Sequence, residues 1–212
     1  MSRFLRAGAG MGHAALALFA LVVALAALRY LAPDPPAAPP EVLANRFAGG
    51  FLPMHAGFAA LALAIGWIQF SSELRKRRPG MHRTIGLVYV FACLAGGVAG
   101  LMLALGTTAG PVALAGFGLL AVAWLVTTAT GAGLALSGRY ARHRRWMIRS
   151  YALTLAAVTL RLQLPAAAML EMDFSVAYPA ISFLCWVPNL IAAELWLAAT
   201  GRQNQPASRS AG

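Results

Sequence analysis

Charged residues are scarce in this sequence, and acidic residues are the scarcest of them. Of 212 residues, 11% are charged and six are Asp or Glu, whereas 60% are hydrophobic and the mean hydropathy is +0.70. Soluble domains usually carry about a quarter charged residues. The composition therefore excludes an ordinary soluble domain and indicates an integral membrane protein.

Cysteine is also rare, and the patterns that metal sites and nucleophiles need are missing. Cys93 and Cys185 lie in apolar runs without metal-ligand spacing, so we expect small buried side chains there. No Ser or Cys lies in the sequence context of a nucleophile elbow or a triad. The loops are too short to hold a soluble catalytic domain. The sequence therefore indicates no catalytic residue and no metal ligand.

Apolar runs long enough to cross a bilayer, which takes about 20 helical residues, occur six times. They cover residues 12–31, 51–71, 84–105, 111–136, 146–170 and 177–200. We predict an all-α bundle of six transmembrane helices, forming one membrane domain over 12–200. A cytoplasmic N-terminal tail, 1–11, precedes it, and a disordered cytoplasmic tail, 201–212, follows it. Arg3 and Arg6 before the first run are also typical of a secretory signal, but its long apolar core and the following Pro33 favour a retained helix.

The cations alternate from one side of the bundle to the other. They gather before the first run, in loops 75–83 and 139–149, and in the last tail, whereas the alternate loops carry only Arg29 and Arg46. By the positive-inside rule both termini are cytoplasmic, and the protein is a multi-pass protein of the bacterial cytoplasmic membrane. We expect the bilayer, with anionic lipids at the cytoplasmic face, as the partner. The net charge of +11 does not indicate nucleic acid, because the cations do not form one face of a soluble fold.

Arg161 lies inside the fifth apolar run, roughly 13 Å below its outer end at 1.5 Å per residue. It either snorkels to the outer surface or forms the charged wall of a cavity that receives an anionic or polar group. Thr154 shares its helix face, and His55, at similar depth, lies on a small-residue stripe with Gln69. Asn189 follows Pro188, which should kink the sixth span and free carbonyls for Asn189 to satisfy. The tentative ligand-binding residues are His55, Arg161, Thr154, Gln69 and Asn189.

Two other features concern helix packing. Glu194 lies toward the cytoplasmic end of its span, so we expect its partner to be a cytoplasmic arginine or Lys76 rather than Arg161. Gly96 and Gly100 have the spacing of close helix contacts. The glycine faces also permit a homo-oligomer.

Two His-Arg pairs, His82 with Arg83 and His143 with Arg144, stand where the chain enters an outward-going span. Two histidines at matched depth are the minimum for bis-histidine haem ligation, and the arginines could meet haem propionates. The structural alternative is a set of interfacial cations that attract anionic lipid, with Trp146 as an anchor. The sequence requires no cofactor, and haem b is the alternative that these residues leave open.

The segments "MHAGFAALALAIGWIQF", "RRPGMHRTIGLVYV" and "HRRWMIRSYALTLAAVTLRLQLP" resemble the bacterial membrane family catalogued as domain of unknown function 2306. The resemblance covers roughly 55–165 and more loosely the sixth span, with a family-like region of about 51–200. It implies a polytopic membrane protein without an established activity. It also implies a shared polar constellation of His55, His82, His143, Arg149 and Arg161.

The leading functional hypothesis is binding or movement of a small molecule or lipid headgroup at a polar intramembrane site built around His55 and Arg161. One alternative is a b-type haem or quinone-linked electron-transfer protein that uses His82 and His143. Another is a membrane scaffold without a ligand. Nothing in the sequence establishes an enzyme.

Overall fold

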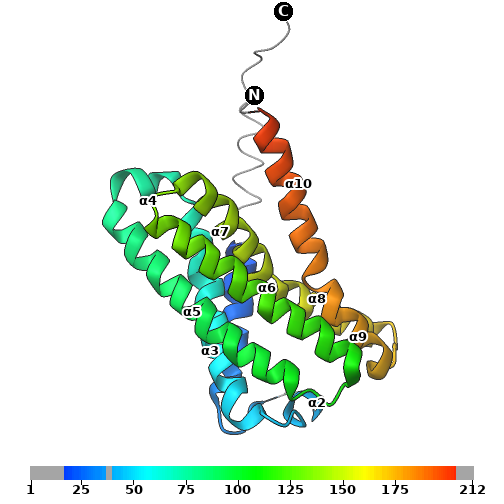
Figure 1. Ribbon diagram of the computed structural model, residues 1–212. Coiled ribbons are helices and arrows are strands. Elements are labelled where there is room, and N and C mark those ends of the chain that lie inside the picture. The colour runs from blue at the N-terminus through cyan, green and yellow to red at the C-terminus, as the bar shows by residue number, and fades with distance from the viewer. Residues whose placement is uncertain (1–16, 37–39, 204–212) are drawn as a thin grey trace, which may run out of the picture.

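The computed structural model describes residues 17–36 and 40–203, which form helices joined by short turns, with no strand among them (Figure 1). The all-α prediction is confirmed. The predicted N-terminal tail, the start of the first span and the end of the C-terminal tail lie outside the described residues. The predicted tail at 201–203 is wrong in one respect, because these residues continue the last helix.

Five helices are long and apolar enough to cross a membrane: Ala48–Phe70, Pro79–Leu105, Gly110–Leu136, Tyr140–Met169 and Phe174–Thr200. A shorter apolar helix, Ala17–Leu31, precedes them. Large apolar side chains cover the outward faces; Leu87 is 68% exposed and Leu162 is 53% exposed. An apolar belt of this kind needs an apolar surrounding. The chain is therefore a multi-pass membrane protein.

Several spans are subdivided. α3 (Ala48–Gly66) continues as η2 (Trp67–Phe70), followed by the short α4 (Ser72–Arg77); a short α2 (Pro40–Leu43) precedes α3, and the 3-10 turn η1 (Leu28–Leu31) ends the first helix. α5 (Pro79–Leu105) and α6 (Gly110–Leu136) are continuous. The fifth span consists of α7 (Tyr140–Thr154) and α8 (Ala156–Met169), and the sixth of α9 (Phe174–Leu184) and α10 (Val187–Gln203).

The third and fifth spans begin earlier than predicted, at Pro79 and Tyr140 rather than at 84 and 146. Proline at the first helical position costs no backbone hydrogen bond, so α5 can begin within the basic segment. His82 and His143 consequently lie inside helices, each at the fourth residue. The sequence placed both histidines just before the helices.

Each of the last two spans is broken once. The break at Leu155 follows Thr154, whose hydroxyl donates to the Ser150 carbonyl oxygen at 3.0 Å, a bond that commonly bends helices. The break between α9 and α10 lies just before Pro188, as predicted, because proline cannot continue the preceding helical turn. Asn189 Nδ2 donates to the Cys185 carbonyl oxygen at 3.2 Å. The Leu184 carbonyl oxygen, which lacks a backbone donor because Pro188 has no N–H, accepts from Gln163 Nε2 of the preceding span at 3.1 Å, a partner that the sequence did not indicate.

α9 begins at a capped end outside the spans. Asp173 is the N-cap, and its Oδ1 accepts a hydrogen bond from Ser175 N at 2.8 Å. Hydrogen bonds to a carboxylate stabilise its ionised form, so the bond from Ser175 holds the pKa of Asp173 below its ordinary value. The cap fixes where the chain turns back into the sixth span.

The core is a four-helix bundle in which α3 packs on α5, α5 on α6, α6 on α7, and α7 back on α3. α5 and α7 are therefore diagonally opposite across its interior. α9 packs on α6 and α8, whereas α10 packs on α7 and extends away from the bundle beyond α4 and α7 (Figure 1). The predicted close contact of Gly96 is confirmed: a Cβ built there would lie 3.3 Å from Phe58 Cβ and 3.4 Å from Ala59 N of α3.

Candidate functional site

A buried network of polar side chains occupies the middle of the bundle; we call it the hydroxyl cluster. The Tyr89 hydroxyl lies 3.0 Å from both Ser150 Oγ and Thr154 Oγ1, which joins α5 to α7. From α6, Thr128 Oγ1 lies 2.7 Å from Ser150 Oγ, and Trp124 Nε1 donates to Thr154 Oγ1 at 3.0 Å. Each of these polar groups has a protein partner, so the cluster is a satisfied structural network rather than an open binding site.

The hydroxyl cluster fixes the rotation of α5 and α7 relative to each other. Tyr89 lies seven residues after His82, and Ser150 lies seven residues after His143. Seven residues are nearly two helical turns, so each histidine shares the face of its partner in the cluster, about 10 Å farther along the helix. Since Tyr89 and Ser150 meet across the interior, His82 and His143 face the same interior at the basic end.

The two imidazoles of this histidine pair are held by the other two helices of the bundle. His143 Nδ1 lies 2.7 Å from the Gly131 carbonyl oxygen of α6. A carbonyl only accepts, so Nδ1 carries the proton and Nε2 keeps a free lone pair. The side-chain amide of Gln69 in η2 has hydrogen-bond partners at both ends in one orientation. In that orientation Nε2 donates to His82 Nδ1 at 2.9 Å, and Oε1 accepts from Gly86 N at 3.2 Å. All four core segments therefore contribute to this layer.

Gly86 and Met147 lie in the layer between the histidine pair and the hydroxyl cluster. Gly86 occupies the position one turn above His82, and Met147 the position one turn above His143. A Cβ built on Gly131 would lie 2.6 Å from Met147 Sδ. Methionine is unbranched and flexible, so this layer can rearrange around a ligand more readily than the cluster above it.

The cations around the histidine pair differ from those expected. Arg75 Nη1 donates to the Gln69 carbonyl oxygen at 3.1 Å, and its charge acts on His82. Arg83 is exposed, and the guanidinium of Arg144 lies over the Trp196 ring, 5.4 Å from its centroid. The sequence singled out the arginine next to each histidine and missed Arg75, which the fold of α4 brings back to the site.

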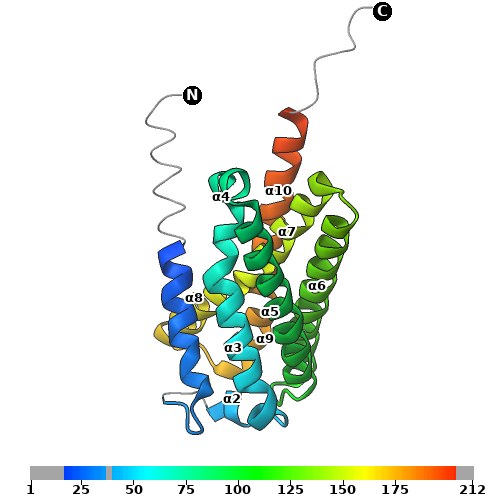
Figure 2. The ribbon, with the colours of Figure 1, turned by 90° about the vertical axis from the view of Figure 1, so that its left-hand side faces the viewer.

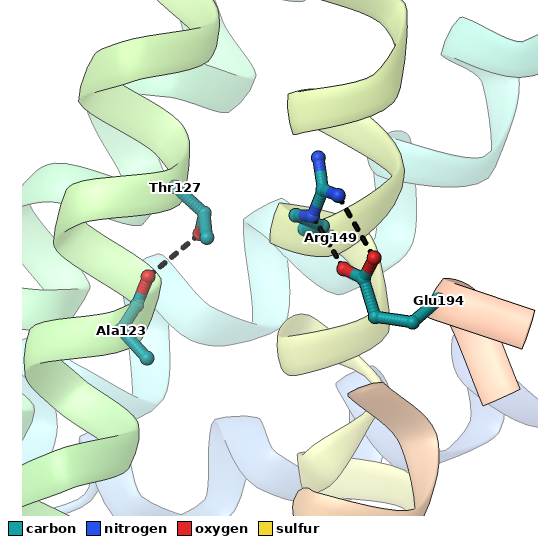
Figure 3. A network of polar contacts seen from close by, with 4 residues as sticks. All are labelled: Ala123, Thr127, Arg149 and Glu194. Carbon is teal, nitrogen blue, oxygen red and sulfur yellow. Dashed lines mark hydrogen bonds and ion pairs between the residues drawn. The ribbon is translucent and has the colours of Figure 1, made fainter. Parts of the chain in front are cut away.

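Arg149 and Glu194 form a bidentate ion pair between α7 and α10 (Figure 3). Arg149 Nε lies 2.5 Å from Glu194 Oε1, and Nη2 lies 2.8 Å from Oε2. The predicted pairing of Glu194 with an arginine at its own end of the bundle is confirmed. In the same view Thr127 donates to the Ala123 carbonyl oxygen of its own helix at 2.7 Å, so it takes no part in the pair.

His55 and Arg161 have separate partners. His55 Nδ1 lies 2.8 Å from the Gly96 carbonyl oxygen of α5, and a Cβ built on Gly100 would lie 2.9 Å from the same nitrogen. Arg161 Nη1 donates to the Ala157 carbonyl oxygen of its own helix at 3.1 Å. No hydrogen bond joins His55 to Arg161 in the described part of the chain, although their charges interact.

The five residues expected to bind a ligand are therefore distributed over the molecule. His55 lies between α3 and α5, Gln69 holds His82, and Thr154 belongs to the hydroxyl cluster. Asn189 Nδ2 donates to Thr159 Oγ1 at 3.0 Å, a pairing of α10 with α8 that the sequence did not indicate. The structure brings together His82, His143 and Gln69 instead.

The comparison with protein families matches most of the chain. A family model described as "Predicted membrane protein (DUF2306)" matches residues 52–197. That range contains the histidine pair, the hydroxyl cluster and Arg161, and it leaves out the first apolar helix. No curated protein and no solved structure matches the chain.

Proposed function

The chain belongs to the DUF2306 family of membrane proteins, whose description names no activity, and from the geometry of the histidine pair we propose a b-type haem protein that carries electrons in the membrane. The observation behind this proposal is the register of α5 and α7. His82 and His143 lie two turns from a hydrogen-bonded pair that joins diagonally opposite helices. Facing helices of a four-helix bundle commonly supply cofactor ligands in this way.

The partners of each histidine suit axial ligation. The Gly131 carbonyl oxygen holds the proton of His143 on Nδ1, which orients the ring and leaves Nε2 as the ligating atom. When Gln69 Nε2 donates to His82 Nδ1, the proton of the neutral His82 ring is on Nε2. For His82 to ligate through Nε2, this proton moves to Nδ1, and the Gln69 amide rotates by half a turn so that Oε1 accepts the hydrogen bond from Nδ1. Arg75 and Arg83 are the cations at this end that could pair with propionates. Haem bound by two histidines would supply a one-electron redox couple.

The small-molecule hypothesis built on His55 and Arg161 is less well supported by the geometry. Its residues have partners in different parts of the bundle, and the inward-facing Thr154 is committed to the hydroxyl cluster. We further propose the six-span topology with both termini cytoplasmic, in the bacterial cytoplasmic membrane. It puts the histidine pair near the cytoplasmic surface, where soluble redox partners have access.

The test is the visible absorbance of the full-length protein, purified in mild detergent from cells supplied with a haem precursor. We expect a Soret band that shifts on reduction with dithionite, and a resolved α band in the reduced spectrum. His82→Ala and His143→Ala should each remove most of this absorbance. His55→Ala is the matched control, because His55 also bonds to a backbone carbonyl through Nδ1 but has no histidine opposite it. A folded protein without a haem spectrum would refute the proposal.

A further inference from the structure

Packing of the first apolar helix places a second arginine near Arg161. Ala20, Val23, Ala24 and Ala27 pack in one apolar cluster with Val158 of α8 and with Ala60 and Leu63 of α3. Figure 2 shows this first helix running alongside α3, with α8 nearby. Arg29 follows Ala27 by two residues, and Arg161 follows Val158 by three. Both arginines therefore lie just beyond the same apolar cluster, two and three residues after members of it.

These two arginines have no acidic partner among the side chains that the structure describes. The ion pairs there are Arg77 with Glu73 and Arg149 with Glu194, both at the opposite, basic end. Arg161 uses one N–H on the Ala157 carbonyl oxygen, and Arg29 Nη2 donates to the Tyr30 hydroxyl at 3.1 Å. A guanidinium has five N–H donors. Most of the donors of Arg161 are therefore left for another acceptor.

An unpaired charge at this depth is unfavourable in a membrane protein. Arg161 is half-buried and lies eight residues before the end of α8 at Met169, about 12 Å along the helix axis. A cation in hydrocarbon is stabilised by an anion or by reaching the interface. Two neighbouring cations repel each other, and an anion between them removes that repulsion.

We propose that Arg161 and Arg29, with the Tyr30 hydroxyl beside Arg29, bind a phosphate group on the outer side of the apolar cluster that joins the first apolar helix to α8. Planar guanidinium groups match phosphate oxygens with paired hydrogen bonds. Exposed apolar side chains of both helices, Leu28, Leu31 and Leu162, flank this position and suit the acyl chains of a phospholipid. The phosphate belongs to a lipid headgroup or to a free anion. The effect of inorganic phosphate in the experiment below distinguishes these two sources.

The experiment uses delipidated full-length protein in a sugar-based detergent. Three probes are added separately: phosphatidylglycerol, diacylglycerol as the lipid without phosphate, and inorganic phosphate. Thermal unfolding reports binding, because a ligand of the folded state raises the midpoint. Native mass spectrometry counts the phosphatidylglycerol molecules that wild type and each variant retain. A molecule lost in the arginine variants is assigned to the outer site, because these variants leave the basic inner face unchanged.

We expect phosphatidylglycerol to raise the midpoint and diacylglycerol to leave it unchanged. Arg161→Gln and Arg29→Gln should each retain one phosphatidylglycerol fewer than wild type and need about tenfold more lipid for half of the shift, given the usual strength of hydrogen bonds to charged groups. Arg46→Gln is the matched control, since Arg46 is an exposed arginine with the same predicted orientation. An effect of inorganic phosphate equal to that of the lipid, lost in the same variants, assigns the site to a free anion.

The proposal is overturned if Arg161→Gln and Arg29→Gln bind phosphatidylglycerol as wild type does, because Arg161 is then only a snorkelling cation. If Arg161→Gln does not fold, Arg29→Gln still decides the question, because Arg29 is exposed and outside the core. His82→Ala should leave lipid binding unchanged. Failure of this proposal is therefore distinguishable from failure of the haem proposal.

Discussion

Gly116 and Gly118 lie two residues apart on α6, but replacement by alanine should change stability in opposite directions. It should lower stability at Gly116, where α6 contacts α9, and raise it at Gly118. A Cβ built on Gly116 would lie 2.7 Å from Ser182 Cβ and 2.9 Å from the Ser182 carbonyl carbon. Ser182 is fully buried, and its hydroxyl donates to the Pro179 carbonyl oxygen at 2.6 Å. Part of the clash involves backbone, so no rotamer relieves it. Gly118→Ala meets nothing within 4 Å.

The magnitudes follow from two opposing effects. Alanine in a helix is about 1 kcal/mol more favourable than glycine, and overpacking typically costs about 1–3 kcal/mol. Gly118→Ala gains the first effect alone, so we expect a free energy of unfolding up to about 1 kcal/mol higher than that of wild type. Gly116→Ala should be up to about 2 kcal/mol less stable than wild type, because the strain exceeds the gain. The two variants should differ by the strain alone, about 1–3 kcal/mol.

The assay is reversible unfolding in mixed micelles, with helix content followed as the fraction of denaturing detergent rises. The double variant Gly116→Ala with Ser182→Gly removes the side-chain part of the clash and should recover some of the lost stability. The reasoning about this contact fails if Gly116→Ala is as stable as Gly118→Ala.

Three other experiments test the interior and the ion pair. A double-mutant cycle of Arg149→Ala and Glu194→Ala should give a coupling near 1 kcal/mol, since the pair is bidentate but its side chains are 18% and 46% exposed; a zero coupling in unfolding assays would contradict this. Tyr89→Phe loses two interhelical hydrogen bonds, each about 0.6 kcal/mol on average, and should lower the unfolding free energy by about 1 kcal/mol; an unchanged value would argue against the cluster as a structural network. Gly131→Ala should displace Met147 toward the histidine layer and so lower the ratio of haem to protein absorbance. Gly133→Ala is the control, because a Cβ there meets nothing within 4 Å. Equal ratios in the two variants would place the haem elsewhere.

Features that depend on one helix and its own sequence were predictable. The spans follow from hydropathy, which needs no knowledge of neighbours. The break before Pro188 follows from the missing N–H of proline. The bond from Asn189 to the Cys185 carbonyl oxygen follows from their separation of one helical turn. The partner of Glu194 followed from depth alone, because the cations at its end of the bundle are arginines and one lysine. In each case the relevant distance lies along one helix axis.

Features that depend on the rotation of one helix against another were not predictable. The sequence placed His55 and Arg161 at similar depth, but depth does not determine which neighbour each side chain meets. The sequence did not single out Tyr89, yet its hydroxyl joins α5 to α7. A signal for its role was present in the spacing of seven residues from His82 to Tyr89 and from His143 to Ser150. Interpreting that spacing requires knowing that α5 and α7 are diagonal across one bundle.

The hydroxyl cluster also explains why the core has one histidine site rather than two. Tyr89, Thr128 and Ser150 are 2%, 0% and 0% exposed, and their hydroxyls bond to one another, so a ligand at the inner end cannot extend past this layer without breaking buried hydrogen bonds. Beyond it, the outer half contains His55, whose Nδ1 already bonds to the Gly96 carbonyl oxygen. The chain has four histidines, and His13 lies outside the residues that the structure describes. Among the described residues, His82 and His143 have their partners at the basic end and neither bonds near His55, so the proposed electron transfer relies on the histidine pair there.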